Sequence, residues 1–215
     1  MDVLLENARF FSELIYTFLV VLICFAIHWK TKESYELTKH EGIKHFRNAF
    51  LLFGFSYIVR LLLSLTLFST FTLELFIPRA LVGLIFLLPM SFLSTLAIFY
   101  LLASSFWKNY SPKQIQTAGL LLAGLLSIAA FITSSNLVLT LLQFALLIIY
   151  VIISFLTENK VFKVKTLSLL IFAFWILSLW VVTPGLRISF ELLSLLQIMS
   201  LVVLAAVYIR LSKWV

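Results

Sequence analysis

The feature that most constrains this sequence is a series of apolar runs, each separated from the next by a short polar segment. A helix needs about 20 apolar residues to cross the hydrocarbon core of a membrane. With 63% of residues hydrophobic and only 12% charged, the chain cannot resemble an ordinary soluble domain. We therefore predict an all-α integral membrane bundle of seven transmembrane helices, with the spans Phe10–Trp29, Ala49–Thr70, Ala80–Phe106, Thr117–Thr133, Leu137–Leu156, Leu167–Thr183 and Ile188–Ile209.

Only three residues, Ser134-Ser135-Asn136, divide the fourth run from the fifth. The whole stretch is nearly twice as long as one crossing requires, which favours a tight helical hairpin. The alternative is one long interrupted segment, which would leave six spans. Since the other connections are also short, we predict a single helical domain over residues 1–215 and no soluble domain. Any effector would then be a separate protein.

Lysine and arginine residues gather at alternate ends of the predicted spans. On one side lie Arg9, Arg79 and Arg187, whereas the other side holds Lys30, Lys32, Lys39, Lys44, Arg47, Lys108, Lys113, Lys160, Lys163, Lys165, Arg210 and Lys213. Because cytoplasmic loops carry the excess of basic residues, we predict an N-terminus outside and a C-terminus in the cytoplasm. The net charge of +7 then indicates contact with anionic lipid rather than with nucleic acid, and the plasma membrane is the expected location.

One charged side chain, Arg60, falls near the middle of a predicted span. An arginine at the bilayer centre costs at least about 2.5–3.5 kcal/mol on insertion scales, so the bundle must supply partners or water. Ser56, Arg60 and Ser64 are four residues apart and share one face of a helix. Lipid offers this face no hydrogen bonds, so we predict that it points into the bundle, with Tyr57 at its edge.

Several other polar side chains reach a depth similar to that of Arg60, at a rise of 1.5 Å per residue. The carboxylates of Glu13 and Glu191 lie nearer the outer ends of their helices and lean outward, which disfavours a direct ion pair with Arg60. We predict an outward-opening polar cavity for an anionic or zwitterionic molecule, with the carboxylates at its mouth. The candidate ligand-binding residues are Arg60, Tyr57, Gln197, Tyr16, Glu13, Glu191 and Gln143.

The sequence does not support catalysis or metal binding. It contains no H-E-x-x-H, G-x-S-x-G or P-loop motif. Cys24 and His28 share a helical face, but a zinc site needs three or four ligands. We therefore expect no enzymatic activity, no metal and no cofactor. The oligomeric state stays open.

Seven helices with an outside N-terminus resemble the topology of microbial rhodopsins and of the SWEET sugar transporters. No lysine lies in any predicted span, so retinal cannot attach as a Schiff base. The recurring helix prolines of the SWEET proteins are also missing, since only Pro89 lies inside a span. The resemblance is confined to topology and assigns no family.

The leading hypothesis is a receptor-like or sensor-like protein. It would bind a small ligand near Arg60 and transmit a shift through the third helix, where Pro89 favours a kink. The alternatives are a small transporter or channel subunit that uses the same cavity, and a structural subunit in which Arg60 is bonded to carbonyls and the glutamines join helices.

Overall fold

The computed structural model describes residues 2–72, 79–133, 136–156, 162–182 and 189–213, and these are helical almost throughout. The predicted span ends Thr183 and Ile188, the hairpin residues Ser134 and Ser135, and the charged residues Lys160 and Arg187 lie outside the described residues. The described elements are α1 (Asp2–Thr38), α2 (Glu41–Thr72), α3 (Arg79–Phe106), the short 3-10 helix η1 (Trp107–Asn109), α4 (Pro112–Thr133), α5 (Asn136–Leu156), α6 (Phe162–Val182) and α7 (Phe190–Ser212).

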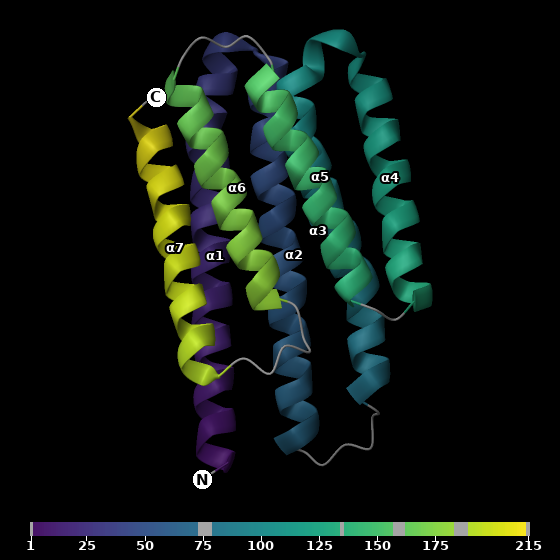
Figure 1. The fold of residues 1–215 in the computed structure, drawn as a ribbon, viewed down its shortest axis with the longest axis vertical. Helices are drawn as coiled ribbons and strands as arrows, with labels where there is room; N and C mark the ends of the chain where they lie inside the picture. The colour runs from purple at the N-terminus through teal and green to yellow at the C-terminus, as the bar shows by residue number, and fades with distance from the viewer. Residues whose placement is uncertain (1, 73–78, 134–135, 157–161, 183–188, 214–215) are drawn as a thin grey trace.

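The helices run up and down in turn, so the two ends of the chain lie at opposite ends of the bundle (Figure 1). Packing follows a ring in the order α1, α2, α3, α5, α6 and α7, which closes because α7 packs against α1. Helix α4 lies outside this ring, against α3 and α5, and at the opposite edge of the view from α7. The ring therefore encloses an interior shared by six helices.

Six helices of the described chain, all except α6, are long and apolar enough to cross a membrane. The prediction of a multi-pass helical bundle is confirmed. Helices α4 and α5 are separate, with 22 and 21 residues, so the alternative of one interrupted segment is wrong. Helix α6 has 21 residues, as many as α5, but its apolar stretch covers only Thr166–Leu179. Its lower end in Figure 1 stops well above those of α1 and α2.

The polar segment between the first two predicted spans, residues 30–48, is almost entirely helical. Helix α1 continues to Thr38, and α2 already begins at Glu41. Lys39 takes a φ of 53°, and its N–H donates to the Tyr35 carbonyl at 2.7 Å, the geometry of a left-handed helix end. The polar segment therefore extends the two spanning helices beyond the apolar region.

Local sequence signals set the start of α4. The Ser111 N–H donates to the Gln114 side-chain oxygen at 3.0 Å, and the Gln114 N–H donates to the Ser111 hydroxyl at 3.3 Å. This reciprocal pair is a capping box, and Pro112 occupies the first helical position, where its missing N–H costs nothing. Helix α4 therefore begins five residues before the predicted Thr117.

Close packing of α4 on α3 depends on Gly119. A Cβ at this position would lie 2.7 Å from Cδ1 of Phe99, a side chain that is itself buried. At Gly124, on the same helix, a Cβ would meet nothing within 4 Å. Packing therefore requires a glycine at position 119, whereas position 124 has room for a larger side chain.

We predict that Gly119→Ala lowers the thermal unfolding temperature, because the added methyl group displaces Phe99 at a cost of about 1–3 kcal/mol. The matched variant Gly124→Ala adds the same methyl group on the same helix without a clash and should not lower it. Thermal unfolding of the purified protein in detergent checks both. Equal destabilisation by the two changes would contradict this packing account.

The predicted orientation can be checked by cysteine labelling, because the single cysteine, Cys24, is fully buried. Thr133 and Thr38 are exposed at opposite ends of the bundle. In whole cells, an impermeant maleimide should label Thr133→Cys directly and Thr38→Cys only after permeabilisation. The unsubstituted protein is the control, and the reverse pattern would invert the orientation.

Candidate functional site

Arg60 lies inside the bundle with only 8% of its surface exposed. Its Nη2 donates to the Val181 carbonyl at 3.4 Å, from the last turn of α6. Carbonyls in the last turn of a helix have no intrahelical partner and carry the negative end of the helix dipole. The last described turn of α6 therefore provides a partner for the guanidinium inside the bundle.

The second terminal nitrogen of Arg60, Nη1, is buried and has no hydrogen-bond partner among the described residues. No described carboxylate lies within ion-pair distance of the guanidinium. Its central carbon lies 5.9 Å from the ring centroid of Tyr57, close enough for a cation–π contact. Arg60 is thus only partly compensated and keeps one donor for a further acceptor.

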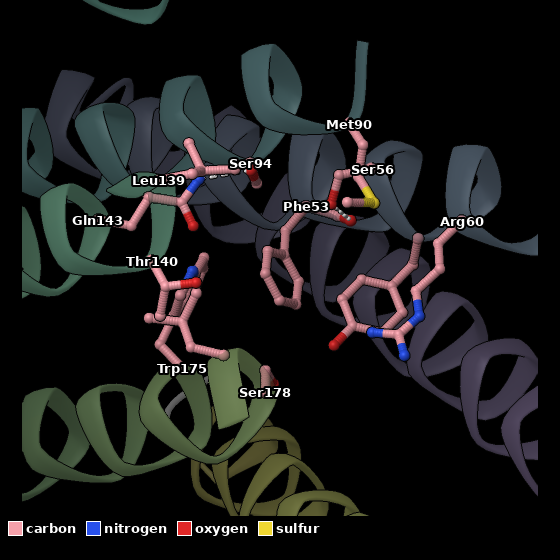
Figure 2. Close-up of a pocket in the computed structure, with 12 residues that line it drawn as sticks. Phe53, Ser56, Arg60, Met90, Ser94, Leu139, Thr140, Gln143, Trp175 and Ser178 are labelled. Carbon is pink, nitrogen blue, oxygen red and sulfur yellow. Dashed lines mark hydrogen bonds between the residues drawn. The ribbon is translucent and has the colours of Figure 1, made fainter. Parts of the chain in front are cut away.

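A cavity of about 40 Å³ adjoins Arg60 between α2, α3, α5 and α6. Figure 2 shows Arg60 at one end and Gln143 with Trp175 at the other, with Phe53 between them. The lining residues are Phe53, Ser56, Tyr57, Arg60, Met90, Ser94, Leu139, Thr140, Gln143, Trp175, Ser178 and Leu179.

The end of the cavity opposite Arg60 also has a fixed polar group. The Gln143 amide nitrogen donates to the hydroxyls of Ser94 at 2.7 Å and Thr95 at 3.1 Å, which joins α5 to α3. The fully buried Trp175 has an indole N–H without an acceptor among the described residues. Two buried donors, one cationic and one neutral, therefore lack partners in the wall of one cavity.

A second polar cluster lies beside the cavity and connects α1, α2, α6 and α7. The Tyr16 hydroxyl is 3.4 Å from that of Tyr57 and 3.0 Å from that of Ser200. Ser200 is in turn 3.4 Å from Ser178, which lines the cavity. One turn away, Ser12 donates to the Gln197 side-chain oxygen at 2.6 Å, and the Gln197 amide nitrogen is unpartnered among the described residues.

An apolar layer closes the cavity toward the basic end of the bundle, which is the end that carries most of the lysine and arginine residues. On each of the four surrounding helices, the residue about one turn beyond the cavity lining, on the side of the basic end, is apolar and fully buried. The four residues are at most 1% exposed and belong to one core cluster: Phe50, Ile98, Leu147 and Ile171. The polar groups of the cavity therefore do not continue to the basic end.

The structure divides the seven candidate ligand-binding residues into three groups: residues that line the cavity, residues buried in the second polar cluster, and carboxylates that belong to neither. Arg60, Tyr57 and Gln143 line the cavity.

Tyr16 and Gln197 are buried in the second cluster, and neither lines the cavity. Glu13 is half-buried, Glu191 is exposed, and neither is among the lining residues. The predicted carboxylate mouth therefore does not border this cavity. The helical rise placed these side chains at about the right depth but carried no information on which helices are neighbours.

Sequence analysis missed Trp175, Phe53 and Val181 as parts of the site. Trp175 lies within a predicted span, whereas membrane tryptophans concentrate at the interfaces. A mid-span tryptophan needs a partner for its N–H, and that signal could have identified it. Val181 contributes only its carbonyl, which depends on where α6 ends, and no side-chain pattern indicates that position.

Comparisons with known proteins add no function. No family model and no solved structure matches the chain. An uncharacterised protein of Archaeoglobus fulgidus is 28% identical over 177 residues, which cover 78% of each chain. This similarity extends over most of both chains but carries no statement about ligand, activity or partner.

The second cluster yields a stability prediction. Tyr16→Phe keeps the ring but removes the hydroxyl between Tyr57 and Ser200. Because interhelical hydrogen bonds in membranes average about 0.6 kcal/mol and reach about 1.7, we expect a small loss of stability within this range. Equilibrium unfolding in mixed micelles measures it, with the exposed Tyr110→Phe as a control that should change nothing. A loss no larger than that of the control would contradict a hydrogen-bonding role for Tyr16.

Proposed function

We propose that this multi-pass membrane protein is a receptor-like or sensor-like subunit that binds a small ligand in the cavity between α2, α3, α5 and α6. One observation carries the proposal: the nine-tenths buried Arg60 keeps an unpartnered N–H at a cavity. Intramembrane charges are usually functional because they are costly to keep. A ligand with an acceptor group would complete the coordination of this cation.

A receptor fits the shape of the cavity better than a transporter does. The apolar layer of Phe50, Ile98, Leu147 and Ile171 separates the cavity from the basic end, so a bound molecule has no polar path across. The hydrogen bonds from Tyr57 to Tyr16 and on to Ser200 connect the cavity wall to α1 and α7. A change at Arg60 would reach these helices through this connection.

The basic end of the bundle is where a signal would leave the membrane. Lys30, Lys32 and Lys44 form ion pairs with neighbouring glutamates at 3.7, 3.7 and 3.0 Å, whereas Lys39 and Arg47 lie over the Tyr35 ring at 5.8 and 5.2 Å. We propose that this end faces the cytoplasm of the plasma membrane, contacts anionic lipid and is read by a separate effector protein. No nucleic-acid partner is proposed.

Two other functions each have an observation in their favour. Gln143, Ser94 and Thr95 extend the polar surface from Arg60 toward the basic end, as a transporter or channel subunit would require. The bond from Arg60 to Val181 is the kind of carbonyl partner that a structural subunit would use. Both alternatives make different predictions for the experiment below.

The test is a thermal-shift screen of the purified protein in detergent with small anionic and zwitterionic metabolites. We expect at least one to raise the unfolding temperature of the wild type and to have no effect on Arg60→Ala. Arg60→Lys keeps the charge but loses the forked geometry, so it should respond more weakly.

Arg210→Ala serves as the matched control, because this arginine lies at the end of α7 and away from the cavity, and it should respond like the wild type. Equal shifts of the unfolding temperature in the wild type and both Arg60 variants would contradict the proposed site. Uptake of the stabilising compound into proteoliposomes would instead support the transporter.

A further inference from the structure

We infer that the ligand of this cavity is a short-chain monocarboxylate with a neutral hydrogen-bond acceptor at its far end, such as a small hydroxy or keto acid. This inference rests on the proposed function and specifies the ligand class for the same site. It follows from the two unpartnered donors, their separation within the cavity and the character of the wall between them.

The anionic end of the ligand is set by Arg60. The guanidinium has one terminal nitrogen committed to Val181 and the other unpartnered among the described residues. No described carboxylate neutralises it at ion-pair distance. A carboxylate would form a charge-assisted hydrogen bond with Nη1, which is roughly twice as strong as a bond between neutral groups. A neutral ligand would leave the buried charge uncompensated.

The far end of the ligand is set by Trp175, whose indole N–H can only donate. The ligand must therefore present an acceptor there. No lysine, arginine or histidine is among the lining residues other than Arg60. A second carboxylate at this end would be a buried charge without a counter-ion, which is strongly unfavourable. The acceptor is accordingly a neutral hydroxyl or carbonyl oxygen.

The middle of the ligand is set by the apolar wall. Phe53 lies between the two polar ends (Figure 2), and its ring centroid is 4.4 Å from that of Trp175. Met90, Leu139 and Leu179 complete this part of the lining. A cavity of about 40 Å³ restricts the chain between the two polar groups to a few methylene groups. An acid from the aqueous phase fits this limit, whereas a lipid-derived fatty acid does not.

The experiment measures binding of five probes to the wild type in nanodiscs by calorimetry: butyrate, 4-hydroxybutyrate, succinate, butyramide and octanoate. We expect 4-hydroxybutyrate to bind best. Butyramide lacks the charge and should bind about 10- to 100-fold more weakly than butyrate. Succinate should lose a similar factor through its second charge, and octanoate should bind more weakly than butyrate because it exceeds the cavity.

Two variants assign these preferences to residues. Arg60→Gln should abolish the difference between butyrate and butyramide. Trp175→Phe keeps a ring but removes the N–H, so it should remove the advantage of 4-hydroxybutyrate over butyrate, about 3- to 10-fold, and leave the preference for an anion intact. Trp29→Phe is the matched control, since this tryptophan is 73% exposed, and it should bind all five probes like the wild type.

The binding results separate a wrong ligand class from a wrong binding site. Equal binding of butyrate and butyramide to the wild type, tighter binding of succinate or octanoate, or no effect of Trp175→Phe would overturn it. If none of the five probes binds while another compound stabilises the wild type but not Arg60→Ala, the ligand class is wrong and the proposed function stands. If no compound distinguishes the wild type from Arg60→Ala, both fail.

Discussion

The structure depends on one electrostatic constraint, the placement of the Arg60 cation inside an apolar bundle. The guanidinium is partly compensated by the Val181 carbonyl at the end of α6 and by the face of the Tyr57 ring. Neither group is an anion, so the charge is retained without a counter-ion among the described residues. The Val181 carbonyl belongs to the last described turn of α6, where the negative end of a helix dipole favours a cation.

The same contacts link two polar regions that would otherwise be independent. Tyr57 contacts Arg60 through its ring and Tyr16 through its hydroxyl, and Ser178 connects the cavity wall with Ser200 on α7. Polar contacts therefore pass from the four helices around the cavity to α1 and α7. Toward the basic end, by contrast, the next turn of these four helices carries the buried apolar residues Phe50, Ile98, Leu147 and Ile171.

Much of the fold could be predicted because membrane insertion imposes strong one-dimensional rules. Apolar run length predicted the helices, and the four-residue spacing of Ser56 and Arg60 predicted their burial, which the structure confirms. The polar segment over residues 30–48 was harder to predict. Its charged residues suit a short interfacial helix and a solvated loop, whereas in the structure they extend α1 and α2. Ser64, one turn further along α2, is only half-buried.

The site was less predictable, because depth along a helix says nothing about which helices pack together. The sequence by itself determined how many helices form, how deep Arg60 lies and at which end the basic residues gather, since these follow from residue spacing and the thickness of a bilayer. Only the tertiary structure decided that α4 stays outside the ring, that Gln143 and Trp175 face Arg60 across one cavity, and that Glu13 and Glu191 do not. Those relations come from side-chain packing between distant segments, which no local pattern encodes.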